Sequence, residues 1–171
     1  MKNKNGDSIY QARLARHHDE LKWLYMELYD NGSMFAELLD QIRQYYLDRP
    51  ESLKKSDRKR EASPDWYKGN DMLGMMLYTE NFAGTFQGVR EKLDYIRESN
   101  VDYIHLMPFL DTPAGRSDGG YAVSDFRRAR PDLGTMEDLR ELTAACHEKE
   151  INVCMDFVMN HTSEDHEWAV K

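Results

Sequence analysis

The sequence is poor in cysteine and lacks long apolar runs. Its two cysteines, Cys146 and Cys154, show no metal-ligand spacing and are too few for a disulfide framework. We interpret both as small buried hydrophobic side chains, which fits a reducing cytoplasm by default. No apolar run approaches the ~20 residues of a membrane helix. The basic residues within 1–6 are not followed by the apolar stretch of a secretory signal. These absences predict a cytoplasmic protein that does not bind membranes.

An excess of basic charge is also missing. The chain has 23 Lys and Arg against 31 Asp and Glu, a net charge of −8. Such a surface repels a phosphate backbone on average, so nucleic acid is not expected as a partner. The basic cluster at 54–60 has acidic neighbours and is interpreted as a solvated helix face. Residues 79–84 lack the glycine pattern of a dinucleotide loop, and no cofactor is expected.

The first part of the chain, residues 1–70, is predicted to be a helical domain. Apolar residues recur at helical intervals from Ser8 to about Arg60. A break at 31–33 makes Ser33 the expected N-cap of the second helix, and Pro50 ends that helix. A short, highly charged third helix is expected after it.

The second part, residues 71–171, follows a different pattern. Apolar runs of strand length at 72–78, 101–107 and 151–158 alternate with helical patterns, with a loop rich in Gly and Pro at 109–134. The first helix is expected at 85–99, with Phe86, Val89, Leu93 and Ile96 on one face. The second helix of this part begins after Thr135, which opens a capping box. Strands that are apolar on both faces and alternate with helices predict an α/β fold with a parallel sheet covered by helices. Periodicity alone leaves a doubly wound sheet and a TIM barrel open.

Polar residues follow two of the predicted strands. Ligands of α/β folds bind beyond the C-terminal ends of parallel strands. There, Asp118 and Tyr121 flank a glycine pair, and Asn160 and His161 follow the third strand. A carboxylate, an aromatic ring and an imidazole suit a sugar. Each feature also has a structural interpretation. The glycine pair could be only a turn, Asp156 inside the third strand could anchor loops, and residues 160–161 could cap the strand end.

Taken together, these motifs resemble a known family. Residues 156–161, Asp-Phe-Val-Met-Asn-His, match the Asp-x-x-x-Asn-His signature of the third barrel strand in the α-amylase superfamily, glycoside hydrolase family 13. Residues 103–108 resemble that family's second strand. Residues 117–127 resemble its sucrose-active branch. A helical domain that leads through Asp-Trp-Tyr at 65–67 into the first strand is similar to the amylosucrases of that family.

The resemblance implies a fold and a reaction. The fold would be a helical N-terminal domain followed by the first three β/α units of an incomplete TIM (β/α)8 barrel. The enzyme would cleave sucrose with retention through a covalent glucosyl-enzyme, pass glucose to an α-glucan and release fructose. Retention needs two carboxyl groups ~5–5.5 Å apart. In the family these follow the fourth and fifth strands. We therefore expect the catalytic residues to lie beyond Lys171 and none of them in this chain. The fragment is expected to be inactive alone.

The resemblance also assigns roles around a bound glucose. Asp118 would hold the distal hydroxyls, Tyr121 would form a platform under the ring, and His161 would donate to a hydroxyl near the reacting carbon. Asp156 and Asn160 would support the site. In many amylases the matching Asn binds calcium, but the amylosucrase branch is not expected to need a metal.

Other functions remain open at this point. Sucrose hydrolase, sucrose phosphorylase, glucosyl isomerase and other α-amylase-family glucosidases share the same N-terminal motifs. A non-catalytic sugar-binding or assembly module is an alternative from another class. Three parallel strands cannot close a barrel, so an open sheet edge would favour self-association.

Overall fold

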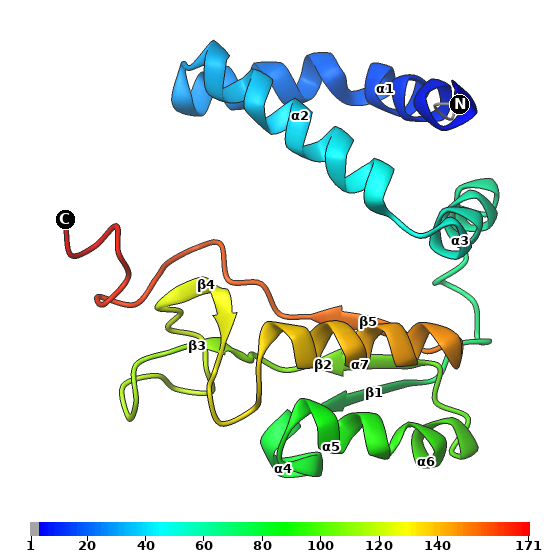
Figure 1. The fold of residues 1–171 in the computed structure, drawn as a ribbon, viewed down its shortest axis with the longest axis vertical. Helices are drawn as coiled ribbons and strands as arrows, with labels where there is room; N and C mark the ends of the chain where they lie inside the picture. Colours follow the sequence, from blue (N-terminus) through cyan, green and yellow to red (C-terminus); the bar gives the residue numbers. More distant parts are fainter. Residues whose placement is uncertain (1–3) are drawn as a thin grey trace. The chain divides into compact units, whose positions relative to one another are not determined.

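The structure, a computed structural model, describes residues 4–171 and divides into two compact units, up to Trp66 and from Tyr67 onward (Figure 1). Within the described residues, the first unit consists of α1 (Lys4–Tyr29), α2 (Gly32–Asp48) and α3 (Glu51–Ala62). The helical pattern of the sequence is confirmed here. Among residues 4–171, no helix is both long and apolar enough to cross a membrane.

The start of α2 corrects one expectation. The N-cap is Asn31, whose side-chain oxygen accepts a hydrogen bond from the backbone nitrogen of Met34 at 3.1 Å. Ser33 already lies inside the helix, and its hydroxyl donates to the same Asn31 oxygen at 2.8 Å. Asn31 takes the cap because its backbone is extended, the conformation that lets a short polar side chain reach the first free amides.

A few buried side chains and a set of ion pairs hold the first unit together. Tyr10 and Phe35 are buried, and the Tyr10 hydroxyl donates to the carbonyl of Leu39 at 3.2 Å, which joins α1 to α2. Helix α3 is fastened by charge. Arg13 of α1 bonds Glu61 at 2.7 Å, and Arg16 pairs with the same carboxylate. The position of α3 in this unit therefore depends on an ionised Glu61.

This dependence predicts an acid-sensitive contact. Hydrogen bonds from Arg13 and Arg16 lower the pKa of Glu61 from 4.5 to about 2. Because the folded pKa is depressed, the stabilisation is complete above pH 4.5 and is lost as the pH falls toward 2. We expect Glu61→Gln to destabilise the first unit at pH 7, and the difference from the wild type to shrink steadily below pH 4.5. Urea unfolding of both proteins across this pH range measures it. A difference that is independent of pH would contradict the assignment.

The second unit is built on a parallel sheet, as predicted. Strands β1 (Gly74–Leu77), β2 (Tyr103–Leu106) and β5 (Asn152–Met155) pair in the order β1-β2-β5. Helices α4 (Thr79–Ala83), α5 (Phe86–Glu91), α6 (Leu93–Glu98) and α7 (Met136–Glu148) accompany it (Figure 1). The sheet and helices are consistent with part of a TIM barrel.

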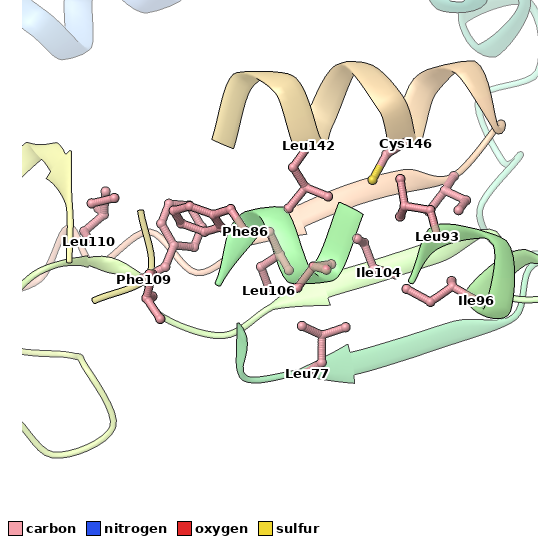
Figure 2. Packing of buried hydrophobic residues seen from close by; sticks show 14 of the residues in the cluster. Leu77, Phe86, Leu93, Ile96, Ile104, Leu106, Phe109, Leu110, Leu142 and Cys146 are labelled. Atoms are coloured by element: carbon pink, nitrogen blue, oxygen red, sulfur yellow. The ribbon is translucent and has the colours of Figure 1, made fainter. Parts of the chain in front are cut away.

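The main core lies between the sheet and its helices. Figure 2 shows Leu142 and Cys146 of α7 pointing toward the strands, and Leu77, Ile104 and Leu106 extending from the strands into the same cluster. Residues of alternate rows point to the other face, since side chains alternate along a strand. There Met76, His105 and Cys154 share one row, and Met76 is 67% exposed.

The two cysteines have different environments. Cys146 is fully buried, as expected, and burial raises the pKa of its thiol to about 12. Cys154 is only half-buried, so the interpretation of both as buried is wrong for this residue. The reason is its position in the strand, on the face opposite the helices.

Several boundaries also differ from the sequence prediction. The expected helix at 85–99 is broken at Lys92 into α5 and α6. The loop at 109–134 contains an antiparallel pair, β3 (Leu110–Asp111) and β4 (Asp125–Ala129). Strand β5 ends at Met155, so Asp156 follows the strand and does not lie inside it. The capping box at Thr135 is confirmed, with Asp138 as its acidic member.

Candidate functional site

Asp156 is the meeting point of three segments at the C-terminal end of the sheet. Its backbone nitrogen donates to the carbonyl of Leu106, the last residue of β2, at 3.3 Å. One carboxylate oxygen, Oδ2, accepts the hydroxyl of Tyr121 at 2.8 Å. The other, Oδ1, lies 2.9 Å from Nε2 of His105. The structure therefore joins two of the predicted site residues, Tyr121 and Asp156, directly.

The electrostatics of this group follow from its hydrogen bonds. Burial opposes ionisation of Asp156, but the bonds from Tyr121 and His105 outweigh it and lower the pKa of the carboxyl below its ordinary value. The bond to Asp156 is the main cause that raises the pKa of the Tyr121 phenol, since the phenol proton is held by a carboxylate. The pKa values of Asp156 and Tyr121 are thus shifted in opposite directions. Near neutral pH the pair is therefore a carboxylate and an uncharged phenol.

A glycine bend places Tyr121. Gly119 and Gly120 have φ values of +61° and +86°, and the backbone nitrogen of Tyr121 donates to the carbonyl of Asp118 at 3.2 Å. A Cβ on Gly120 would stand 2.9 Å from Cβ of Pro108, so a larger residue does not fit there. The glycine pair is thus a turn, and that turn also presents the Tyr121 ring, which is 38% exposed.

The side chains of Asp118, Asn160 and His161 are exposed. Asp118 lies in the loop that contains Tyr121, and Asn160 and His161 lie in the segment that follows β5. Nδ2 of Asn160 lies 3.3 Å from Nδ1 of His161. Because an amide nitrogen only donates, this contact leaves Nε2 of the imidazole as the protonated nitrogen. Within residues 4–171, no hydrogen bond joins the side chains of Asp118 or His161 to Tyr121 or Asp156.

The segment after β5 is tied to the segment that contains Tyr121. The backbone nitrogen of Ser163 donates to the carbonyl of Val123 at 2.8 Å. Arg127 bonds Glu167 at 2.8 Å. Arg116 pairs with a further two carboxylates of the later segment, Glu164 and Asp165. Residues 116–127 and 160–167 are therefore held together, and we call these two segments the rim.

His105 was missed as a site residue by the sequence analysis. Its signal is a polar side chain between Ile104 and Leu106, two fully buried residues of a short strand. The contact with Asp156 depends on the register that pairs His105 with Cys154, two residues before Asp156. No group of three or more metal-ligating side chains occurs in the part of the chain that the structure describes.

The chemistry that the rim offers is recognition of hydroxyl groups. It combines an exposed carboxylate, an exposed phenol ring and an exposed imidazole on a fixed scaffold. Residues 41–171 match the family model for the catalytic domain of alpha amylase. The chain belongs to the alpha-amylase family. It is an enzyme family of glycoside hydrolases and transferases, and the chain covers only part of its catalytic domain.

Curated relatives of the chain include a trehalose synthase/amylase and a trehalose-6-phosphate hydrolase. The chain is 46% identical over 116 residues to a trehalose synthase/amylase of Mycolicibacterium smegmatis, which covers 65% of this chain and 19% of that protein. It is 36% identical over 117 residues to the trehalose-6-phosphate hydrolase of Bacillus subtilis, with 64% and 20% covered. The chain thus spans about a fifth of the length of these curated relatives.

Solved structures agree with this assignment. Trehalose-6-phosphate hydrolase of Bacillus licheniformis superposes with a TM-score of 0.56 at 37% identity, covering 61% of this chain and 20% of that one. An isomaltulose synthase mutant of Erwinia rhapontici, in complex with its natural substrate sucrose, gives a TM-score of 0.54 at 30% identity, with 58% and 19% covered. Both structures are therefore similar to this chain in backbone fold and in sequence.

Proposed function

We propose that this chain forms the glucose-binding part of a retaining enzyme that acts on α-glucosides, with sucrose as its substrate. The observation that carries the proposal is the bond between Tyr121 and Asp156, which holds an exposed ring on the rim that also bears Asp118 and His161. Family membership supports the reaction class.

Each rim residue has a defined role in this proposal. The Asp118 carboxylate accepts hydrogen bonds from glucose hydroxyls, and the Tyr121 ring packs on the apolar face of the sugar. His161 donates from Nε2 to a hydroxyl near the reacting carbon, a bond that strengthens as charge develops in the transition state. Asp156 holds Tyr121, and Asn160 orients His161. The nucleophile and the acid/base would come from outside these 171 residues.

Amylosucrase activity is the finer part of the proposal. It is supported by the Ser-Asp-Gly-Gly-Tyr sequence at 117–121 and by the helical unit before the first strand. Two relatives with sucrose in their structures, the trehalulose synthase MutB and an isomaltulose synthase, are similar to this chain over about three fifths of its length. In such an enzyme glucose would pass to an α-glucan, and fructose would be released.

A trehalose-active enzyme is the second candidate function. It is favoured by the 46% identity to a trehalose synthase/amylase over the matched region. Both candidates place a glucosyl unit on the rim and differ in the partner sugar. Comparing sucrose and trehalose as competitors for the same glucose site separates them.

The test is a binding and cleavage experiment on the 171-residue chain. We expect glucose to bind weakly, with saturation-transfer signals, and we expect Asp118→Ala to weaken binding about tenfold, since one charge-assisted set of hydrogen bonds is lost. Asp19→Ala, an exposed Asp of α1, is the matched control and should bind like the wild type. Incubation with sucrose should release no fructose.

Two results would contradict the proposal. Equal binding of glucose by the wild type and Asp118→Ala would remove Asp118 from the site. Fructose release above that of Asp118→Ala would show that carboxylates within this chain perform the cleavage.

Assembly is a separate proposal that rests on the sheet. β1 and β5 are the outer strands of the parallel sheet, and the exposed Met76 lies on the face away from the helices. Outer strands with unpaired backbone groups favour pairing with further strands. Sedimentation over a range of concentrations measures this, and a monomer throughout would argue against it.

A further inference from the structure

The Asp156 carboxylate has one partner on each oxygen. Tyr121 bonds Oδ2 at 2.8 Å, and His105 approaches Oδ1 at 2.9 Å. A rotation of the carboxylate about its bond to Cβ would break both contacts at once. The two partners therefore fix the orientation of Asp156 together, and the position of the Tyr121 hydroxyl depends on the imidazole on the far side.

The protonation of His105 follows from this geometry. An ionised carboxylate can only accept hydrogen bonds, so Nε2 of His105 carries the proton in this contact. The low pKa of Asp156 agrees with an ionised acceptor. The residues aligned with His105 on the adjacent strands are Met76 and Cys154, which places a thioether and a thiol beside it in the row.

His105 is itself rigidly placed. Its neighbours Ile104 and Leu106 are fully buried in the core, and β2 is paired on both sides, with β1 and with β5. A central strand with buried neighbours offers a fixed point from which a side chain can orient another. Tyr121, in contrast, sits on a loop whose path depends on two glycines.

The Tyr121 ring also lies against the glycine bend. A Cβ on Gly119 would lie 3.4 Å from two carbons of the ring and 3.3 Å from the Tyr78 hydroxyl. The ring therefore lies close to the Gly119 backbone. Its hydroxyl is held by Asp156, and part of its surface stays open to a ligand.

We propose that His105 is a positioning residue of the sugar site. It donates Nε2–H to Asp156 and so fixes the carboxylate that holds the Tyr121 ring in the position in which glucose packs against it. This role rests on the proposed glucose-binding function of the rim. It assigns the orientation of a loop tyrosine to a strand histidine, through one carboxylate that contacts both.

The test compares His105→Phe with His105→Gln in the full chain. Phe keeps a ring of similar size without the donor, while the Gln amide offers a donor near the position of Nε2. In His105→Phe we expect the pKa of Asp156, followed by its carboxyl carbon signal in NMR, to rise by about one pH unit. We also expect the Overhauser contact between the Tyr121 ring and the Gly119 α-protons to weaken. Gln should restore both signals.

Defined results overturn the inference. Unchanged Asp156 and Tyr121 signals in folded His105→Phe would show that the imidazole does not orient the carboxylate. A Gln variant as perturbed as the Phe variant would mean that shape, not the donor, matters. If His105→Phe does not fold, the nitrogen shifts of His105 in the wild type decide: a proton on Nε2 supports the role, and a proton on Nδ1 alone overturns it.

The sugar is tested separately. Glucose binding by the wild type, measured by saturation transfer, reports the proposed function, whereas the signals of Asp156 and Tyr121 are recorded without sugar. Absence of glucose binding with His105-dependent signals would reject the sugar site and keep the contact. Glucose binding that is as strong in His105→Phe as in the wild type would reject the positioning role and keep the site.

Discussion

Replacing Gly88 with Ala is expected to lower the free energy of unfolding of the second unit by about 3 kcal/mol. Gly88 lies in α5, where Ala is ordinarily favoured over Gly by ~1 kcal/mol. Here the sign reverses, because a Cβ at this position would stand 2.1 Å from the carbonyl oxygen of Ala83, the last residue of α4. Backbone cannot rotate away as a flexible side chain does, so α4 and α5 must separate.

The matched control is Gly69→Ala in the same unit. A Cβ on Gly69 meets its closest atom, a carboxylate oxygen of Asp71, at 3.5 Å, which is ordinary contact. We expect this variant to change the stability by less than ~0.5 kcal/mol. Hydrogen exchange of the β2 amides reports the second unit apart from the first. A Gly88→Ala protein as stable as the Gly69→Ala protein would show that α4 and α5 are not packed this closely.

The second large effect is expected for Phe86→Ala, with a loss of about 4 kcal/mol. The Phe86 ring is fully buried and packs edge-on against Phe109, with ring centres 5.5 Å apart (Figure 2). Its backbone nitrogen donates to the carbonyl of Leu133 at 2.9 Å, so the backbone is tied to the segment before α7. A backbone fixed in this way cannot move to fill the cavity, and the full cost of truncation remains.

Phe157→Ala supplies the matched comparison. Phe157 is 53% exposed and contacts Phe126, with ring centres 5.4 Å apart, so truncation removes the same atoms from a half-open surface. We expect a loss of ~1 kcal/mol or less. The two variants are compared by the same exchange measurement. Equal losses would contradict the packing of the core between the sheet and the helices.

The sequence predicted the parts of the fold that are encoded by apolar spacing. Phe86, Val89, Leu93 and Ile96 recur at helical intervals, and all four are buried. The parallel sheet followed from apolar runs without polar alternation. The β3–β4 pair was missed because β4 reads Asp-Phe-Arg-Arg-Ala, which has no apolar face, and because Leu110–Asp111 is too short to show a period. Such a pair is specified by its tertiary neighbours.

The candidate site was predictable in place but not in its contacts. Strand order and the rule on strand ends bring Tyr121 and Asp156 to the same edge, although they are 35 residues apart in the chain. Which oxygen each partner takes depends on strand register and side-chain rotamers, which composition does not encode. His105 was missed for this reason: a single polar residue in a short apolar strand has no spacing to mark it. The roles of Asp118 and His161 stay predictions.

The two rim segments, 116–127 and 160–167, share a backbone bond from Ser163 to Val123 and ion pairs that include Arg127 with Glu167. In a chimera between relatives, a crossover placed between them would combine an arginine from one parent with a carboxylate position from the other. The two segments must therefore come from the same parent, although a helix and a strand separate them in the chain. Exchange of one loop alone would separate Tyr121 from the segment that bears His161, whereas exchange of residues 112–168 as a whole would carry the rim intact.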